Sequence, residues 1–463
     1  MSHAVNTHGK TDWHPGAPDT AFALAAARGV PLFLYWGAAW CPPCNRIKAT
    51  VFERADFQAL GAQCVALHLD GDSAGAQQMA ERFHVRSYPT LIVYRPDGSE
   101  ITRLPCELDG ARFVELLRVA LAARYSVAQS LSAALSGERP LSDDEWRLLS
   151  FYSWDTDEHQ LLKSLDLAAT LASLTRACTL PEAMQRLQWH ALHAAATAGK
   201  GGIDQRAAVK RLEEMLFDPA AVRAQLDIVT NHAVDLVRFL TVPQSAARLH
   251  LTQTWSGALE RLEADPTVIL ADQLAALRTR VRMSRLGTPV AGMEQLARAR
   301  VAQAAQVACG PAMRHQIMNT AAGVLSDAGL LDEAEQLLLA ELERSHSPFY
   351  FMHNLAAIAK KRGDAATAVG WYERAWDSAT GPATRLQWGA TYLQGLIDFA
   401  PHEAPRIERF ASKMLGELDG MDDAAYQRNR TQLERIDSKL AIWSGDSDLT
   451  SALRQAAQAA AGE

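Results

Sequence analysis

The chain has 463 residues, too many for one hydrophobic core, and its length predicts about three domain-sized units. Apolar residues make up 48% of the chain and charged residues 21%, a globular composition that excludes wholesale disorder. The formal net charge is −7 and no long basic run is present, which argues against nucleic acid and anionic membranes as partners. No stretch approaches the roughly 18 apolar residues that are needed to span a bilayer.

The N-terminal stretch is polar and predicts no export signal. Residues 1–10 lack the apolar core and the small-residue cleavage site of a secretory signal, so we predict a cytoplasmic protein. A true start further upstream would allow a periplasmic location instead. Residues 1–20 as a whole are expected to form a loose lead, in which Trp13 docks on the domain behind it.

Strand-like and helix-like patterns alternate through the first quarter of the chain. Buried strands are expected at residues 32–36 and 64–69, and two further strands at residues 89–94 and 100–104. Helices are expected at residues 20–28, 45–52, 74–83 and 109–123, the first of them stopped by Gly29. The strong turn signal at residues 96–99 joins the last two strands as a hairpin. This alternation predicts an α/β domain.

Two cysteines separated by two prolines stand between the first strand and the second helix. Residues three apart on a helix have Cβ atoms roughly 5–6 Å apart, so a modest adjustment would join Cys41 and Cys44 as a disulfide. At a helix N-terminus, unpaired N–H groups and the positive end of the macrodipole favour the thiolate of Cys41. Pro42 and Pro43 suit a first turn, whose N–H groups have no intrahelical partner. The pattern predicts a redox-active dithiol.

The remaining cysteines and the histidines suggest no metal site. We expect Cys64, Cys106, Cys178 and Cys309 to be small buried apolar residues, because six cysteines are too few for a disulfide scaffold. A zinc site would need a second close pair of ligands. His190 and His193 are three apart on one expected helix but have no third ligand in the sequence around them. We therefore predict neither metal nor cofactor.

Residues 20–124 resemble the thioredoxin family. The resemblance rests on Trp-Cys-Pro-Pro-Cys after the first strand, Tyr-Pro-Thr at residues 88–90, and the order of the elements. It implies a thioredoxin fold, a mixed sheet flanked by helices, in a domain that we place at residues 1–124. It also implies that Cys41 is the exposed attacking thiol and Cys44 the resolving thiol.

The resemblance extends to the surroundings of the dithiol. It implies that the bond before Pro89 is cis, where the proline keeps metals from the sulfurs and presents the backbone of Tyr88 to an extended substrate strand. Trp40 is expected to shield the dithiol on one side, although an aromatic residue could simply be packing there. We assign Trp40, Tyr88, Pro42 and Pro43 to substrate binding.

The sequence departs from the family at one position. The family usually has a buried aspartate six residues before the first cysteine, where it helps deprotonate the resolving thiol, and here that position is Tyr35. Residues 32–39 include no acidic residue that could replace it. The nearest acids are Asp70 and Asp72, for which a turn or loop-cap role is the interpretation we favour. The usual proton route is therefore in doubt.

From Tyr125 onward the sequence is all-α in pattern. Residues 125–314 predict a helical region of degenerate repeats, with the aromatic residues Trp146, Phe151, Tyr152 and Trp154 in a core or at a domain junction. In residues 315–382, pairs of glycine, alanine and larger residues recur 34 positions apart, as in tetratricopeptide repeats. These pairs are Gly329 and Gly363, Ala322 and Ala356, Ala334 and Ala368, and Leu338 and Tyr372. Residues 315–463 are thus predicted to be a tetratricopeptide-like solenoid with C-terminal helices.

These features lead to one main hypothesis and two alternatives. The main hypothesis is a thiol–disulfide oxidoreductase that reduces protein disulfides through Cys41 and Cys44, while its helical arm binds the substrate or a partner. The arm could instead only pack on itself and on the redox domain. The alternatives are a chaperone-like module that holds clients, and a redox sensor in which the disulfide alters the docking of the arm.

Overall fold

The computed structural model describes residues 11–154, 157, 160–163, 165–199, 202–287, 289–307, 309–418, 423 and 426–444. The chain divides into two compact units. The first comprises Met1–Tyr35, Asn45–His68 and Thr90–Leu330, and the second comprises Trp36–Cys44, Leu69–Pro89 and Leu331–Glu463. The dithiol segment therefore belongs to the same unit as the C-terminal helices.

A four-stranded sheet is built from the first quarter of the chain. Its strands are β1 (Leu32–Gly37), β2 (Val65–Asp70), β3 (Thr90–Tyr94) and β4 (Glu100–Leu104), in the order β2-β1-β3-β4. The pair β3 and β4 is antiparallel, with Leu91 opposite Leu104. Every residue of β1 is buried, as expected for an apolar strand inside a sheet that is covered on both faces. The four predicted strands are confirmed.

Helices accompany these strands near the predicted positions, but α3 and the 3-10 turn that follows it were not predicted, and the second predicted helix differs in kind. They are α1 (Pro18–Arg28), α2 (Pro42–Ile47), a π-helical turn (Lys48–Phe52), α3 (Ala55–Leu60), a 3-10 turn (Gly61–Gln63), α4 (Ala76–Arg82) and α5 (Gly110–Leu121). The predicted helix over residues 45–52 is thus the end of α2 followed by a π turn. The backbone of this turn approaches α5 closely, because a Cβ at Gly110 would overlap the carbonyl oxygen of Thr50.

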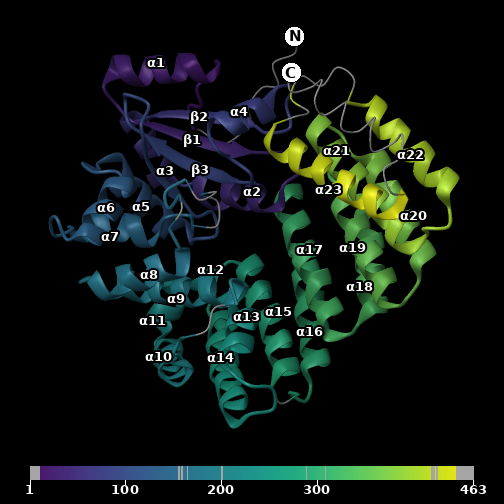
Figure 1. Cartoon of the computed structure of the whole chain (residues 1–463). Coiled ribbons are helices and arrows are strands. Elements are labelled where there is room, and N and C mark those ends of the chain that lie inside the picture. The colour runs from purple at the N-terminus through teal and green to yellow at the C-terminus, as the bar shows by residue number, and fades with distance from the viewer. Residues whose placement is uncertain are drawn as a thin grey trace. The chain divides into compact units, whose positions relative to one another are not determined.

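Every element described after Tyr125 is a helix, which confirms the all-α prediction for this region. The first unit contains α6 (Val127–Ser136), α7 (Asp143–Ser150), α8 (Leu167–Ala177), α9 (Pro181–Thr197), α10 (Gln205–Phe217), α11 (Pro219–Ala224), α12 (Leu226–Asn231), α13 (Ala233–Leu240), α14 (Ala246–Ala264), α15 (Leu270–Leu286), α16 (Met293–Ala305) and α17 (Pro311–Ala328). The second contains α18 (Leu331–Leu342), α19 (Pro348–Lys361), α20 (Ala365–Ser378), α21 (Pro382–Phe399), α22 (Ala404–Gly416) and α23 (Gln427–Ser444), green to yellow in Figure 1.

Aromatic residues form much of the core of the first unit. Trp13 is buried against the rings of Phe33, Tyr35 and Phe52, and it forms a parallel bridge to Ala66 of β2, so its predicted docking is confirmed. The predicted packing role is likewise confirmed for a group of four aromatic residues, all buried: Trp146, Phe151, Tyr152 and Trp154.

The 34-residue spacing has a structural counterpart. Gly329 follows α17 with φ +87° and Gly363 follows α19 with φ +76°, a left-handed conformation that glycine adopts readily. Ala334 on α18 and Ala368 on α20 are both fully buried. The tetratricopeptide assignment stays a prediction, as do the divisions of the chain at residues 124 and 314.

Candidate functional site

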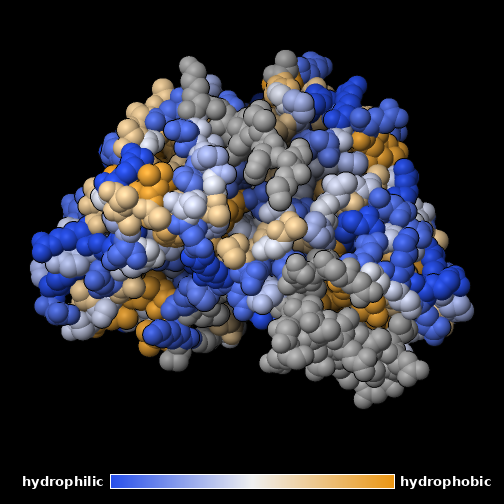
Figure 2. All heavy atoms as spheres, turned by 90° about the horizontal axis from the view of Figure 1, so that it is seen from above, coloured by the Kyte–Doolittle hydropathy of each residue, from blue (hydrophilic) through white to orange (hydrophobic). Residues whose placement is uncertain are grey.

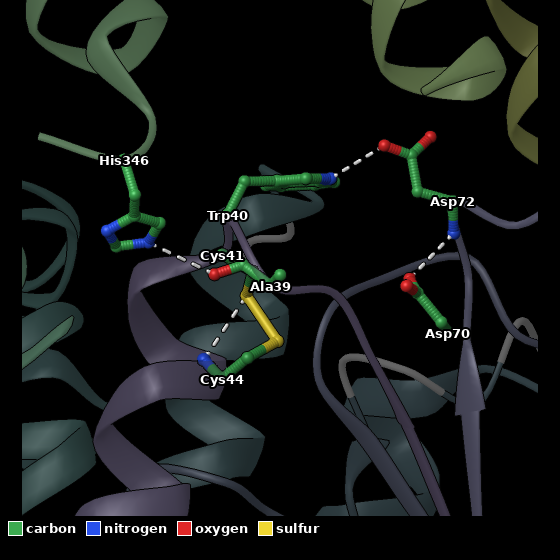
Figure 3. Close-up of a disulfide and its surroundings, with 7 residues drawn as sticks. All are labelled: Ala39, Trp40, Cys41, Cys44, Asp70, Asp72 and His346. Atoms are coloured by element: carbon green, nitrogen blue, oxygen red, sulfur yellow. Dashed lines mark hydrogen bonds between the residues drawn. A yellow bond between two sulfur atoms is a disulfide. The ribbon is translucent and has the colours of Figure 1, made fainter. Parts of the chain in front are cut away.

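The dithiol lies at the start of α2, just after the loop that leaves β1. Cys41 and Cys44 are joined by a disulfide with their Cα atoms 5.2 Å apart, and the Cys44 N–H donates to Cys41 Sγ over 3.2 Å (Figure 3). Cys41 is only 2% exposed, although the sequence predicts an exposed attacking thiol. That expectation is wrong for this arrangement, because helices of the C-terminal region contact the residues beside it.

Trp40 is held by a carboxylate from another loop. Its Nε1–H donates to Oδ2 of Asp72 over 3.0 Å, and Oδ1 of Asp72 accepts from the backbone N–H of Thr384 over 3.0 Å (Figure 3 shows the first bond). Gly381 lies against the same carboxylate, where a Cβ would overlap it. Burial raises the pKa of Asp72 despite these hydrogen bonds. Asp72 therefore joins the indole to the first turn of α21.

Tyr88 and Pro89 close another side of the site. The bond between them is cis, which confirms the predicted conformation, whereas the catalytic role of Pro89 stays a prediction. Tyr88 Oη donates to the carbonyl of Gly71 over 2.8 Å, and its ring lies 5.1 Å from that of Trp40. A Cβ at Gly71 would overlap the Tyr88 ring, so glycine makes this approach possible.

Residues of the C-terminal helices, which the sequence does not single out, complete the site. Tyr350 of α19 stacks on Trp40 with the ring centroids 5.8 Å apart, and the Arg428 guanidinium of α23 lies 5.1 Å from the Trp40 ring and 5.0 Å from the Tyr88 ring. Before α19, His346 Nε2 lies 3.2 Å from the carbonyl oxygen of Ala39 (Figure 3). No local pattern could have connected these residues with a loop that precedes them by more than three hundred positions.

An aromatic residue takes the place of the family's buried aspartate here. Tyr35 is fully buried, with its ring stacked on that of His68 at 4.7 Å and edge-on to Phe52 at 4.9 Å. The carboxylate of Asp70 accepts the backbone N–H of Asp72 over 3.1 Å, which confirms the turn role expected of Asp70 (Figure 3). Asp72, by contrast, bonds the indole beside the dithiol.

Comparison with known proteins agrees with this geometry. Residues 18–121 match a protein family described as a thioredoxin-like domain. This part of the chain is therefore a thioredoxin-like domain. This stretch is 31% identical over 104 residues to thiol:disulfide interchange protein DsbD 2 of Pseudomonas aeruginosa, an alignment that covers 22% of this chain and 18% of that protein.

Two further curated proteins match the thioredoxin-like domain. DsbD 1 of Pseudomonas aeruginosa is 32% identical over 108 residues, and DsbD of Yersinia pestis is 29% identical over 105 residues. Each alignment covers 22% of this chain and 18% of the relative. A solved structure titled DsbH oxidoreductase matches with 16% identity and a TM-score of 0.22, over 27% of this chain and 94% of that one. The likeness to the interchange proteins supports a thiol–disulfide redox role for the domain.

An arginine just after the dithiol anchors the second turn of α2. Arg46 of the thioredoxin-like domain is 4% exposed and forms a bidentate ion pair with Asp272 of α15, with its shorter bond at 2.7 Å. Its Nη1 also donates to the carbonyls of Cys106 and Leu108. A guanidinium with all these partners in a buried position fixes the orientation of the helix.

The remaining cysteines and His190 form no further site among the described residues. Cys64 and Cys178 are buried as predicted, Cys106 is half-buried, and Cys309 is exposed, so the prediction of burial is wrong for Cys309, which lies in the connection between α16 and α17. His190 is buried, and burial lowers its pKa. Within the described residues no three histidine, cysteine or acidic side chains gather as metal ligands would.

None of the described helices is both long and apolar enough to cross a bilayer. On the face drawn in Figure 2, hydrophilic residues predominate and the apolar ones lie in separate patches. The exposed large apolar residues are likewise scattered along the chain, from Leu24 to Ile442.

Proposed function

We propose that the protein is a thiol–disulfide oxidoreductase that reduces disulfides in protein substrates. The observation that carries this proposal is the Cys41–Cys44 disulfide at the start of α2 in a thioredoxin-like domain. The likeness to proteins named thiol:disulfide interchange proteins supports it. Because the chain spans about a fifth of those relatives, their activity as a whole is not carried over.

The proposed reaction has two exchanges. The Cys41 thiolate attacks one sulfur of the substrate disulfide, which forms a mixed disulfide and releases the other substrate sulfur as a thiolate. The Cys44 thiolate then attacks Cys41 Sγ, which releases the first substrate sulfur and closes the Cys41–Cys44 disulfide. The substrate gains two electrons and the enzyme loses two. An external dithiol returns the enzyme to its reduced form.

The chain's own residues would support each step. Trp40 and Tyr88 form an aromatic wall beside the dithiol, and Pro42 and Pro43 occupy the first positions of α2. With Tyr35 in place of the usual aspartate, the proton that Cys44 loses would pass to solvent or to another group. We also propose that the helical arm binds the substrate or a partner protein and that the protein works in a reducing cytoplasm.

Reduction of insulin by dithiothreitol tests the proposal. Wild-type protein should accelerate the reaction, Cys41→Ser should lower it to the rate of dithiothreitol alone, and Cys44→Ser should accumulate a mixed disulfide that is visible by mass spectrometry. Cys309→Ser is the matched control, because it removes an exposed thiol that belongs to no disulfide, and it should act as the wild type. Equal rates for wild type and Cys41→Ser would contradict the proposal.

The client-holding and redox-sensor alternatives stay predictions. A Cys41→Ser variant that still suppresses the aggregation of an oxidised client, while insulin reduction is absent in the wild type, would favour the first of them. Altered hydrogen exchange in α18–α23 on reduction of the disulfide would favour the second.

A further inference from the structure

The face of the dithiol that must meet a substrate is covered by the chain itself. Disulfide exchange requires a substrate sulfur to reach Cys41 Sγ directly, so the rate depends on access. Cys41 is 2% exposed and Trp40 8% exposed, and Pro89 is buried. In this arrangement a protein disulfide has no room beside Cys41.

The cover comes from three helices of the C-terminal region, all within the second unit. Tyr350 of α19 stacks on the Trp40 ring, and Arg428 of α23 lies over the rings of both Trp40 and Tyr88. Thr384, in the first turn of α21, donates its N–H to Asp72, which in turn accepts from Trp40. These contacts converge on the residue that directly precedes the nucleophile.

The contacts that close the cover differ from a hydrophobic core. They include the hydrogen bond of Thr384 to Asp72, the contact of His346 with the Ala39 carbonyl, one ring stack and one cation over two rings. Each is of modest strength when it is exchanged for contacts with water. The helices that supply them have their own buried core, which includes Leu355, Trp376 and Leu393. A cover of this kind can separate from the loop while its helices stay folded.

Asp72 connects the two sides of the closure. One oxygen of its carboxylate bonds the loop residue Trp40 and the other bonds the helix residue Thr384, each over 3.0 Å. Gly381, just before α21, has φ +87° and has no Cβ that would overlap the carboxylate. Further contacts join α4 to the C-terminal region: the backbone N–H of Gln77 donates to Asp423, which precedes α23, over 2.9 Å, and Arg430 of α23 pairs with Glu81 at 3.6 Å.

We propose that α19, α21 and α23 form a lid over the dithiol, latched by Asp72 between Trp40 and Thr384, and that lid opening determines which disulfides reach Cys41. This inference rests on the proposed function for its substrate, a protein disulfide, but not for the lid itself. A small reagent can reach Cys41 during a brief opening of the lid. A folded protein substrate can bind beside Cys41 only while the lid stays open. Tyr350, Arg428 and Asp72 are thus specificity-determining residues that position Trp40 and take no part in the exchange.

Alkylation of Cys41 measures lid opening without any reference to activity. In a Cys44→Ser background, iodoacetamide converts the Cys41 thiolate to a thioether with loss of iodide, and mass spectrometry of the peptide gives the rate. If reaction requires opening, the rate equals that of the open form multiplied by its population. We expect Asp72→Asn, Arg428→Ala and Tyr350→Ala to raise the rate by about three- to tenfold.

Matched variants separate lid opening from general loosening. Asp364→Asn removes a carboxylate that caps α20 through Thr367, and Lys439→Ala removes a cation of α23 that pairs with Asp398. Neither residue has a contact with the dithiol loop among those described above, so both variants should react as the background does. Tyr350→Phe keeps the ring that stacks on Trp40 and should also leave the rate unchanged. Circular dichroism and urea unfolding identify any variant that has lost its fold.

The outcomes distinguish the lid from the proposed function. If the three lid variants react no faster than Asp364→Asn and Lys439→Ala, or if Cys41 of the background already reacts as fast as an unfolded cysteine peptide, the lid is overturned. If they react faster but neither the wild type nor any lid variant with Cys44 restored reduces insulin, the lid stands and the proposed function fails. If both hold, the lid variants with Cys44 restored should also gain in insulin reduction relative to reduction of a small disulfide.

Discussion

Two aromatic residues five positions apart lie in opposite kinds of surroundings. Tyr35, in the first unit, is fully buried among the rings of His68, Phe52 and Trp13. Trp40, in the second unit, is bonded to a carboxylate and lies beneath a guanidinium. The first environment is a packed core that nothing can leave without a large loss of stability. The second combines ring contacts with hydrogen bonds that water can replace, as expected of the lid that we propose.

Two carboxylates show the same contrast. Glu145, in the first unit, accepts hydrogen bonds from Arg139, Ser142 and Ser130, and although burial acts in the opposite direction these bonds lower its pKa to about 2. Asp72, in the second unit, has its pKa raised by burial. The fold thus stabilises the charged form of Glu145, whereas it places Asp72 where the charged form is less favourable.

The largest expected effect concerns the anchor of α2. Arg46→Ala would leave Asp272 without its bidentate partner in a mostly buried position, so we expect a loss of about 3–5 kcal/mol in the free energy of unfolding, measured with urea. Arg54→Ala is the control, because Arg54 pairs with Asp56 at the surface, where both side chains are more than a third exposed. That variant should lose less than about 1 kcal/mol. Similar losses in both would mean that the Arg46 pair is no anchor.

Acid titration of Glu145→Gln gives the next effect. A pKa that falls from 4.5 to about 2 on folding stabilises the native state above the unfolded pKa, and this stabilisation disappears as the pH falls through 2. The advantage of the wild type over Glu145→Gln should therefore shrink between pH 6 and pH 2, by less than the roughly 3 kcal/mol that the whole pKa shift represents, because solvent screens the pair with Arg139. Urea unfolding at several pH values measures it. A difference that does not vary with pH would refute the assignment.

For Asp72→Asn, the stability difference from the wild type should vary with pH in the opposite direction, and by the smallest amount. Because folding raises its pKa above the ordinary 3.8, the contribution of Asp72 is fully present below that pH and declines as the pH rises through the folded value. The stability of the wild type relative to Asp72→Asn should thus fall as the pH is raised from about 4. The change should be smaller than for Glu145, because the bonds from Trp40 and Thr384 oppose the effect of burial. A rise with pH would contradict the burial of this carboxylate.

The sequence predicts those parts of the molecule that depend on neighbours in the chain. The four strands, the end of α1 at Gly29 and the hairpin follow from local patterns and turn residues, and the cis bond before Pro89 follows from the family motif. The π turn after α2 was not predictable, because a local apolar period does not distinguish it from an α-helix.

The cover of the dithiol could not be predicted from the sequence, for a different reason. Tyr350 and Arg428 are single residues on helices, and nothing in their spacing differs from an ordinary surface or core position. Their partner Trp40 lies in a loop more than three hundred residues earlier, and only the packed chain brings them together. The exposed Cys309 was mispredicted because the average burial of cysteine says nothing about one connection between two helices.

The second unit is assembled from distant segments, and this has a consequence for protein synthesis. Its residues 36–44 and 69–89 leave the ribosome long before its helices, which begin at Leu331. At about 5–20 residues per second, the roughly 200 residues between the thioredoxin-like domain and α18 take on the order of 10–40 seconds to translate. During that interval the cysteine pair of the nascent chain has no cover. Cellular thiols can then exchange with it and set its oxidation state before the last helices are synthesised.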